Sequence, residues 1–456
     1  MPLCIVLKLN KKIMKMNKLV LMVMGWLMIT PNLQAQEVLS LESCREMALS
    51  HNRDLKTAAL QIQEAESNYK LAKKAYLPSI EGSATGIMMP TLNLDLFPGM
   101  AIPEGPAIPP IGVESPGILT AGVFAVQPIY TGGKIKAVNE QAKLGKAMSQ
   151  ENYNLTYAEL IEKTDEAYWN VIAAKEGVKL TKTYVEMLDS LESQMELMYN
   201  EGLLPLSEKL KVSVQKNQAV LEQVKAENQV TLAILFLSQI IGIEDETKYE
   251  FIDELAFQSS TINIQEGVNI GLAQRSEIKL LDNHIRINEL EQKVTQADYL
   301  PQVGVMAGGM YIYGNNGLDN IDPIAVVGGT VRIPIFHFNE SQEKKTVARL
   351  QTQKAIHERD NASEMISIEI KQIGYQLEEN RRSIAIAQDN ITQAQESLEE
   401  TKISFSSGLN TTTEVLQSQS ELLRMQFELI LALKNHEVLK TKWLRATGQI
   451  HNPPIR

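Results

Sequence analysis

The chain has 456 residues, of which 44% are hydrophobic but only 5% are aromatic, and its formal net charge is −11. It is long enough to bury a large core, yet small apolar side chains must do much of the packing. The acidic balance, with no basic run after the N-terminal segment, excludes a nucleic-acid partner.

The first 36 residues are typical of an export signal. Lys15 and Lys18 precede an apolar run over Leu19–Ile29, and Leu33–Ala35 offers a small-residue cleavage site. The run is about eleven residues long, too short for a bilayer, which needs roughly 20 residues per helix. We therefore predict a signal peptide over residues 1–35 and no transmembrane helix after it.

Four long intervals contain no proline, a residue that breaks helix interiors. They are Asn32–Leu77, Ile129–Leu204, Leu206–Leu300 and Ile335–Asn452. We predict that these intervals are mainly helical.

Two predicted helices are unusually long, Gly132–Glu201 and Asn339–Ser407. At 1.5 Å per residue each would run about 100 Å, too far for one ordinary globule. Their apolar residues must be buried along a coiled coil. The last helix carries two adjacent apolar stripes, which begin at Val415 and Leu416 and indicate a neighbour on each side. An antiparallel bundle with one wide apolar face is the alternative.

Two proline-bracketed regions have the composition of strands. The first contains Ile80–Met88 and Ile118–Val126, and the second contains Val303–Tyr313 and Ile324–Ile333. Each is interpreted as a hairpin of about ten-residue strands, the length that a tilted strand needs to cross a bilayer. The long connection Met89–Gly117 fits an external loop of a membrane hairpin, or a solvent loop with no membrane nearby.

The order of these elements occurs twice, which predicts an internal repeat. Tyr76-Leu77-Pro78 recurs as Tyr299-Leu300-Pro301, and Gly202-Leu203 recurs as Gly408-Leu409. Each repeat reads as helix, hairpin, long helix, tip and returning helix. The predicted boundaries are 36–242 for the first repeat, with hairpin 77–130 and tip 200–208; 243–266 for a connecting segment; 267–448 for the second repeat, with hairpin 300–336 and tip 406–414; and 449–456 for a C-terminal tail.

Four aromatic residues fall at the helix-facing ends of the predicted strands: Tyr76, Tyr130, Tyr299 and Phe336. They suit an aromatic belt at the surface of outer-membrane lipid, or plain packing at the strand-to-helix junctions. Four strands cannot close a barrel, and lipid does not tolerate unpaired sheet edges. If the hairpins enter a membrane, the chain must therefore oligomerise.

No pattern indicates chemistry. Gly132-Gly133-Lys134 lacks the leading glycine and the final hydroxyl of a phosphate-binding loop. The six histidines are scattered, with no pair at metal-ligand spacing. Met187, Met195 and Met198 are more typical of helix packing than of a soft-metal site. We predict that the chain is not an enzyme and has no cofactor and no metal site.

The repeat, the segment Gln127–Gly133, the run Ala167–Trp169 and the Gly-Leu tips together resemble the TolC-like outer membrane efflux protein family. The similarity extends from about Leu39 to Gly448, and the duplicated order of elements is more specific than any single motif. It implies a mixed α and β membrane protein. Three copies would form a twelve-stranded outer-membrane β-barrel and a periplasmic α-barrel of coiled-coil helices, with an equatorial belt supplied by 243–266 and the tail.

The resemblance implies an exit duct of a tripartite efflux or type I secretion system, in the outer membrane of a Gram-negative bacterium and extending into the periplasm. Its partners would be two further copies, a periplasmic adaptor (membrane fusion) protein and an inner-membrane transporter. A non-channel coiled-coil structural protein of the cell envelope is the alternative. A duct need not recognise its cargo, so the sequence indicates neither drug, metal nor protein.

The resemblance also implies roles for the tip residues. Glu414 matches an acidic residue at the narrowest ring, and Glu208 is the matching acid of the first tip. Gln417 stands where the family has a second acidic ring, and Asn410 replaces a basic residue that ties closed tips together. Four further residues would contact the adaptor: Gly202, Leu203, Gly408 and Leu409.

Each tip residue also has a structural interpretation. Thr411 and Glu414 fit a capping box at a helix start, and Glu208 suits a first helical turn, where the helix dipole favours an acid. Gly202 and Gly408 suit helix C-caps. A capping carboxylate can also face a pore, so the two interpretations are compatible.

Overall fold

The computed structural model describes residues 37–88, 117–243, 249–251, 254–257, 262–314 and 321–450. The predicted signal peptide, residues 89–116, residues 315–320 between the last two predicted strands and residues 451–456 of the tail lie outside them. Within the described ranges, no helix combines the length and the apolar character needed to cross a membrane.

The described elements follow the same order twice, with helices leading to two strands and then to a long helix and a returning helix. In chain order they are β1 (Glu37–Leu39), α2 (Leu41–His51), α3 (Arg53–Lys74), β2 (Ser79–Met88), β3 (Gly117–Tyr130), α4 (Lys134–Asn200), α5 (Leu206–Ile241), β4 (Tyr249–Phe251), α6 (Ile264–Gln274), α7 (Ser276–Ala297), β5 (Gln302–Gly314), β6 (Ile321–Arg332), α8 (Glu340–Ser406) and α9 (Thr412–Ala446).

These elements fall into two compact units. Unit 1 comprises the described parts of Met1–His51, Lys163–Gln258 and Ser383–Asn435. Unit 2 comprises those of Asn52–Glu162, Ser259–Arg382 and His436–Arg456. The long helices α4, α8 and α9 each contribute residues to both units.

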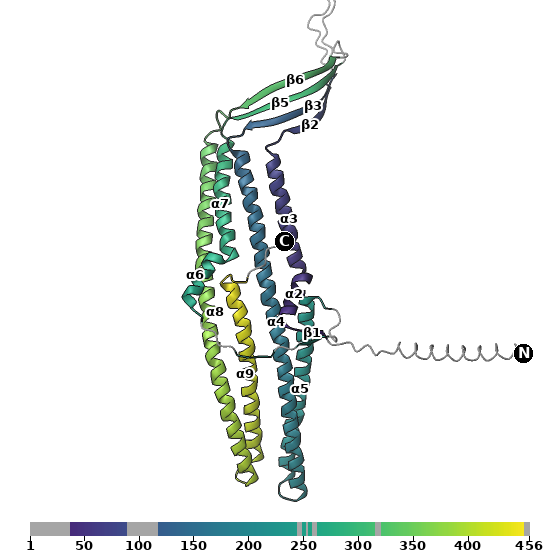
Figure 1. Cartoon of the computed structure of the whole chain (residues 1–456), viewed down its shortest axis with the longest axis vertical. Helices are drawn as coiled ribbons and strands as arrows, with labels where there is room; N and C mark the ends of the chain where they lie inside the picture. The colour runs from purple at the N-terminus through teal and green to yellow at the C-terminus, as the bar shows by residue number, and fades with distance from the viewer. Residues whose placement is uncertain are drawn as a thin grey trace, which may run out of the picture. The chain divides into compact units, whose positions relative to one another are not determined.

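Unit 2 contains a four-stranded antiparallel sheet in the order β2-β3-β5-β6 (Figure 1). The two predicted hairpins are present, and β3 pairs with β5 to join them, with Ile118 opposite Gly314 and Gln127 opposite Val305. In the described residues, β2 and β6 are therefore the edges, and each has one pairing partner. The joined hairpins form one surface rather than two separate ribbons.

The predicted end of the second strand at Val126 is wrong, because β3 continues through Pro128 to Tyr130. Proline has no N–H to donate, and the register with β5 shifts between Pro128 and Tyr130. The proline therefore sits at an irregularity that tolerates the missing hydrogen bond. The other three strands lie within three residues of their predicted ends.

Two predicted helices are each broken once. The first breaks between α2 and α3 at Asn52, whose side chain accepts a hydrogen bond from the Leu55 amide at 2.8 Å. The other breaks between α6 and α7 at Arg275, which occupies the equivalent position in the second repeat. Arg275 has an extended backbone, and its side chain does not cap the helix. An asparagine cap can be found in a sequence. An arginine at a helix start carries no such signal, so tertiary contacts place that break.

Arg275 is held by a buried network in unit 2. Its side chain is 5% exposed and forms ion pairs of 2.6 Å with Glu277 and 2.5 Å with Glu369 of α8. An apolar cluster that includes Ile278 and Ile370 packs nearby. Together these contacts stabilise the break between α6 and α7.

In unit 1, α5 runs beside the C-terminal part of α4, and α9 beside that of α8 (Figure 1). The Tyr184 hydroxyl of α4 connects three of these helices, because it hydrogen bonds with Ser420 of α9 at 3.1 Å and accepts from Gln215 of α5 at 3.0 Å. The predicted coiled-coil burial is present, since Val415 and Gln419 of α9 are 1% and 2% exposed.

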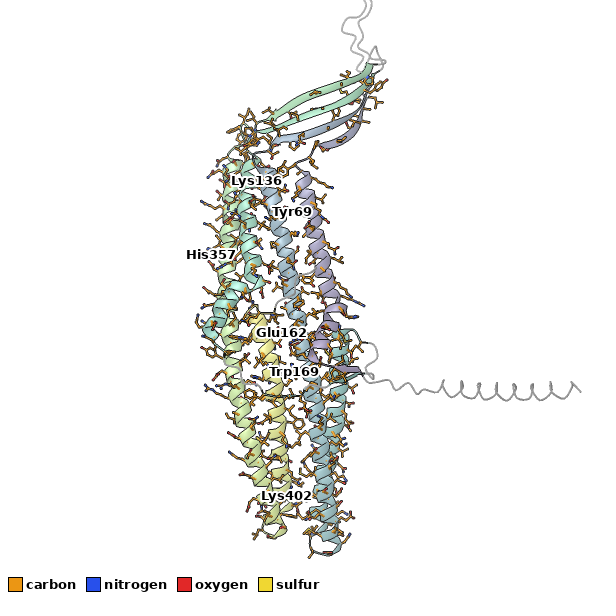
Figure 2. The ribbon with its side chains drawn as sticks, viewed as in Figure 1. Tyr69, Lys136, Glu162, Trp169, His357 and Lys402 are labelled. Carbon is orange, nitrogen blue, oxygen red and sulfur yellow. The ribbon has the colours of Figure 1, made fainter. Side chains whose placement is uncertain are left out.

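The start of the described chain is also held in unit 1. Strand β1 pairs in parallel with β4, a pairing that the sequence did not indicate. The Tyr168 hydroxyl donates to the Leu39 carbonyl at 3.3 Å, and the Tyr168 ring meets Phe251 edge-on. Trp169, labelled in Figure 2, packs against Tyr168 at 5.5 Å between ring centroids. The aromatic pair within α4 thus anchors both short strands.

A bidentate ion pair holds α2 against α4. Asp165 is fully buried, and Arg45 donates to it through Nε at 2.8 Å and Nη2 at 2.6 Å. The carboxylate raises the pKa of the Arg45 guanidinium, so the arginine stays charged. Removing one partner of such a pair leaves the other charge without compensation.

We predict that Asp165→Asn destabilises the chain by about 3 kcal/mol, the lower end of the range for a broken buried pair, because Arg45 is 27% exposed. The measurement is thermal unfolding of the purified protein in detergent, followed by helical circular dichroism. Arg424→Gln is the control, because the ion pairs of Arg424 with described residues are to exposed carboxylates of its own helix. A melting temperature for Asp165→Asn equal to that of the control would contradict the prediction.

Candidate functional site

The two helical tips have the same backbone construction. After α4, Gly202 adopts a φ of 74° and the Leu203 amide donates to the Met198 carbonyl at 2.8 Å. After α8, Gly408 also has a φ of 74°, and the Leu409 amide donates to Ser404 at 2.9 Å. These are Schellman C-caps, in which glycine is favoured because a side chain disfavours the left-handed backbone. The surrounding space is open at both glycines, so the backbone angle alone requires them.

Glu414 lies in the first turn of α9 and forms a reciprocal capping box with Thr411. Its Oε2 accepts from the Thr411 amide at 2.6 Å and from the Thr411 hydroxyl at 3.0 Å, while the Glu414 amide donates to the Thr411 hydroxyl at 3.3 Å. The hydrogen bond from the Thr411 backbone is the main cause that lowers the pKa of Glu414. The Glu414 side chain is exposed. Its lowered pKa keeps the carboxylate ionised at neutral pH, and the hydrogen bonds of the capping box fix its direction.

Glu208 occupies the corresponding turn of α5, with a different set of partners. Lys211 donates to its Oε1 at 2.7 Å, and the buried Thr412 hydroxyl of the other tip lies beside it. The hydrogen bond from Lys211 is the main cause that lowers the pKa of Glu208, and the hydrogen bond from Thr412 is the second. Lys211 also reaches the Thr413 hydroxyl at 3.4 Å. The acid of the first tip is thus part of a polar link between the two tips of one chain.

An apolar cluster lies beneath this polar link. Its buried members come from α4, α5 and α9, and they are Leu191, Met195, Val212 and Val415. Phe405 of α8 and Leu416 of α9 pack against them. All four helices of the tip region therefore share one small core.

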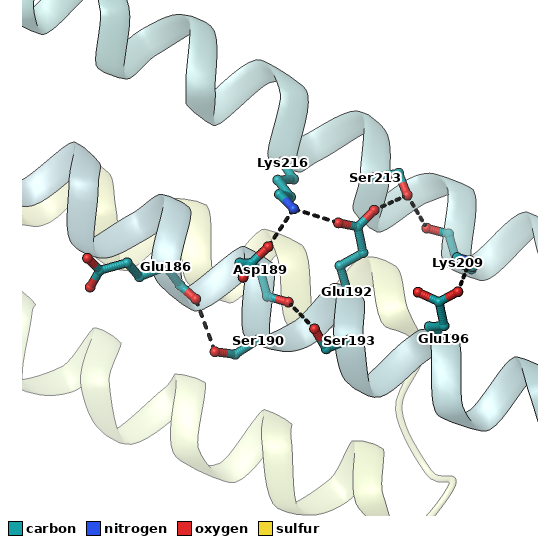
Figure 3. A network of polar contacts seen from close by, with 9 residues as sticks. All are labelled: Glu186, Asp189, Ser190, Glu192, Ser193, Glu196, Lys209, Ser213 and Lys216. Carbon is teal, nitrogen blue, oxygen red and sulfur yellow. Dashed lines mark hydrogen bonds and ion pairs between the residues drawn. The ribbon is translucent and has the colours of Figure 1, made fainter.

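A charged network joins α4 to α5 just above the first tip (Figure 3). Lys216 of α5 donates to Asp189 at 2.5 Å and to Glu192 at 2.8 Å, both on α4, and Ser213 also donates to Glu192. These contacts raise the pKa of Lys216 and lower that of Glu192. The network fixes the pairing of the first two helices without involving the second tip.

The remaining predicted gate residues are neutral. Gln417 is exposed one turn after Glu414 and borders a groove between α5 and α9, with Lys211 and Leu210 on its far side. Asn410 is half-buried in the turn before α9 and brings no charge there. Leu203 and Leu409 are 66% and 81% exposed, so each tip presents an apolar side chain to its surroundings.

The predicted aromatic residues lie at the helix-side ends of the strands in unit 2. Tyr76 and Tyr130 are 50% and 48% exposed, and Phe336 is 71% exposed. Tyr299 is half-buried against His337, with 5.7 Å between ring centroids.

Sequence reasoning missed two exposed apolar residues next to Phe336. Ile335 is 92% exposed, and Phe338 is 87% exposed and packs edge-on to Phe336 at 4.7 Å. The apolar and aromatic run between Pro334 and Asn339 is the sequence pattern that could have indicated these two residues. The link from Lys211 to Thr413 was also missed, because no pattern in one sequence shows that two turns so far apart in the chain meet.

Within the described part of the chain, no cluster of three or more histidine, cysteine or acidic residues could hold a metal ion. The features that stand out are instead two capped tips and a sheet with exposed edges. They define a coiled-coil protein with paired helical tips and a four-stranded antiparallel sheet.

The family model of outer membrane efflux proteins matches residues 44–243 and 272–438. The chain therefore belongs to the outer membrane efflux protein family, and it is an outer-membrane transport duct rather than an enzyme. This match confirms the resemblance and the predicted location. A curated relative is the outer membrane protein TolC of Vibrio cholerae serotype O1, which is 20% identical over 314 residues, covering 67% of this chain and 71% of TolC.

Several solved structures share the fold. CusC matches with a TM-score of 0.75 at 15% identity, over 90% of this chain and 92% of CusC. The outer membrane protein VceC of Vibrio cholerae matches with a TM-score of 0.74 at 17% identity, over 90% and 96%. The MtrE channel of Neisseria gonorrhoeae, solved in an open state, matches with a TM-score of 0.70 at 14% identity, over 90% and 88%. The predicted combination of long helices with four strands per chain is confirmed.

We predict that acid loosens the start of α9. The folded-state pKa of Glu414 is lowered below its ordinary value of 4.5, so the capping box contributes stability that is complete above that value and is lost as the pH falls through the folded-state pKa. Hydrogen exchange at the first-turn amides, corrected for intrinsic rates, will keep its protection above pH 4.5 and lose it as the pH falls further, through the folded-state pKa of Glu414. In Glu414→Gln, which keeps an acceptor at the same position, protection will not change with pH. An equal acid response in both proteins would contradict this assignment.

Proposed function

We propose that the chain forms, as a homotrimer, the exit duct of a tripartite efflux or type I secretion system. The single observation that carries this proposal is the four-stranded sheet with two edges and exposed apolar residues. Ile80, Val327 and Val331 on its strands are 75%, 86% and 65% exposed. In lipid, unpaired backbone groups at β2 and β6 would cost several kcal/mol each, so the sheet must close against other copies.

The number of strands favours three copies over two. An eight-stranded barrel has an interior that side chains fill, whereas twelve strands leave room for a lumen. The family membership and the likeness to solved channels support the same assembly. In this arrangement Tyr76, Tyr130, Tyr299 and Phe336 lie at the periplasmic surface of the outer membrane, where amphipathic rings are favoured.

We further propose that the tips contact a periplasmic adaptor protein, which couples the duct to an inner-membrane transporter. The exposed side chains of Leu203 and Leu409 support this, because each tip otherwise exposes an apolar group to water. Gly202 and Gly408 position them. The duct passes its cargo without chemistry, so the cargo is selected by the transporter.

The proposed gate is a ring of three Glu414 carboxylates around the threefold axis. Its support is the exposed, ionised and directionally fixed carboxylate. Gln417 supplies no second acidic ring, so the expected cation preference depends on Glu414 and on Glu208 in the first tip. Glu208 is already neutralised by Lys211 at 2.7 Å, which makes Glu414 the dominant charge.

We predict that the purified protein forms trimers that dissociate on heating and that conduct ions with cation preference in planar bilayers. In Glu414→Gln trimers the shift in reversal potential under a salt gradient will fall by at least half, because the ring loses its charge while the capping box persists. Glu222→Gln is the control, since Glu222 is exposed on α5 and pairs with Lys225 outside the tips.

Two outcomes of this experiment are decisive. A monomeric periplasmic product with no conductance would refute the duct and favour a coiled-coil envelope protein. If the trimers conduct and the ion selectivity of Glu414→Gln equals that of the wild type, the proposal of a duct stands, but Glu414 does not line the constriction.

The contacts that close the gate are proposed to be the apolar cluster and the Lys211–Thr413 hydrogen bond. Asn410 cannot form the ionic link expected from the family pattern. The cluster joins helices of both tips and is buried, and its Val415 is 1% exposed. Separating the tips would expose these side chains to water.

We predict that Val415→Ala raises channel conductance. Loss of two buried methyl groups costs about 2 kcal/mol, which shifts a closed–open equilibrium by up to about 30-fold if opening separates the cluster. The measurement is single-channel recording of reconstituted trimers. Val438→Ala is the matched control, because Val438 is 7% exposed on the same helix but lies in unit 2. An equal conductance of the two variants would show that the cluster does not separate on opening.

A further inference from the structure

An open pocket of about 470 Å³ lies between α3 and α4 in unit 2, beside the ends of these helices that adjoin the sheet. The helices run antiparallel there, since Asn139 of α4 donates to the Ala72 carbonyl and Lys146 pairs with Glu66. The pocket is lined by Tyr69, Lys73, Tyr76, Lys136, Asn139, Glu140 and Lys143. Figure 2 shows Tyr69 on α3 and Lys136 on α4 in this region. We call it the α3–α4 pocket.

The α3–α4 pocket carries positive charge that the described chain does not neutralise. Lys134 and Lys146, which flank it on α4, pair with Asp298 and Glu66. By contrast, the lining lysines form no ion pair with any described residue, and Glu140 is the one acidic residue among them. The three unpaired lysines are Lys73, Lys136 and Lys143. A local excess of positive charge in a chain of net charge −11 favours an anionic ligand.

A buried amide is also among the residues that line this pocket. Asn139 is 9% exposed, and its Nδ2 donates to the carbonyls of Ala72 at 2.8 Å and Ile135 at 2.9 Å. Those two acceptors fix the orientation of the amide, which leaves Oδ1 buried without a partner among the described residues. A buried acceptor without a donor is costly. The ligand that fits the pocket therefore has a hydrogen-bond donor as well as a negative charge.

The aromatic residues and the helix direction suggest where the ligand comes from. Tyr76 is half-exposed between α3 and β2, and Lys73 lies over the Tyr69 ring at 4.4 Å. Side chains of a helix lean toward its N-terminus, so Lys136 and Lys143 lean toward the strand end of α4. If the strands cross the outer membrane, as the proposed function requires, these ammonium groups lie at the headgroups of the leaflet on the helix side.

We propose that the α3–α4 pocket binds the headgroup of an anionic phospholipid that carries a hydroxyl group, as phosphatidylglycerol does. Lys73, Lys136 and Lys143 hold the phosphate, and a headgroup hydroxyl donates to Asn139 Oδ1. The inference rests on the proposed function for the position of the membrane. Phosphatidylcholine offers neither net negative charge nor a donor. Phosphatidylethanolamine offers a donor, but its ammonium group is repelled by the lysines.

The test measures lipid binding to the purified full-length trimer by native mass spectrometry in detergent, with short-chain phosphatidylglycerol, phosphatidylcholine and phosphatidylethanolamine as probes. We expect phosphatidylglycerol to bind most tightly, and the double variant Lys136→Gln with Lys143→Gln to bind it about 10- to 30-fold more weakly at low salt. The matched control is Lys182→Gln with Lys402→Gln, which removes the same charge from exposed helical positions of unit 1. Its affinity will equal that of the wild type.

Ion conductance of the same trimers separates the failure of this inference from that of the proposed function. Trimers that do not conduct would refute the duct, whatever lipid they bind. In conducting trimers, equal affinity of the two double variants for phosphatidylglycerol would overturn the proposal that the α3–α4 pocket binds this lipid. Equal affinity for glycerol phosphate and phosphatidylglycerol would overturn the assignment to a membrane lipid, because it would show a site for a soluble anion.

Discussion

Backbone hydrogen bonding at the two edges of the β2-β3-β5-β6 sheet is the constraint on which the rest of this structure depends. One chain supplies four strands, and the edges at β2 and β6 have pairing groups that the described chain does not satisfy. Water could satisfy them, but lipid cannot. The proposed outer-membrane duct therefore requires a closed assembly of several copies.

The helical tips are stabilised by capping interactions within each turn and by contacts between the two turns. Each tip turns through a glycine C-cap, and the second is closed by the Thr411–Glu414 capping box, so each turn is stable within its own segment. The small core with Val415 and the link from Lys211 to Thr413 then join the two turns. In the proposed gate, the contacts shared by the two tips can separate without unfolding either turn, because the capping interactions do not cross between the turns. Because Gln417 and Asn410 are neutral, the proposed closed state depends on apolar packing rather than on an ionic link at these positions.

The sequence predicted the helices and strands well because proline and glycine act locally. It missed three features for definite reasons. Pro128 lies inside β3 because the register with β5 shifts beside it, which depends on a partner strand from the other hairpin. The break at Arg275 is held by Glu277 and by Glu369 of another helix. The pairing of β1 with β4 joins segments far apart in the chain, and strands as short as these have no detectable period.

By itself, the sequence determined the duplicated order of elements, the two long helices, the glycine turns and the capping box at Glu414, since each depends on residues within a few positions of one another. Tertiary structure alone decided what these parts meet. It placed Lys211 beside Thr413, joined the two hairpins through β3 and β5, and left the buried Asn139 Oδ1 without a partner among the described residues, next to a pocket with three lysines. The physical reason is that backbone geometry is a local property, whereas ion pairs, dry cores and pockets are formed by side chains that only folding brings together.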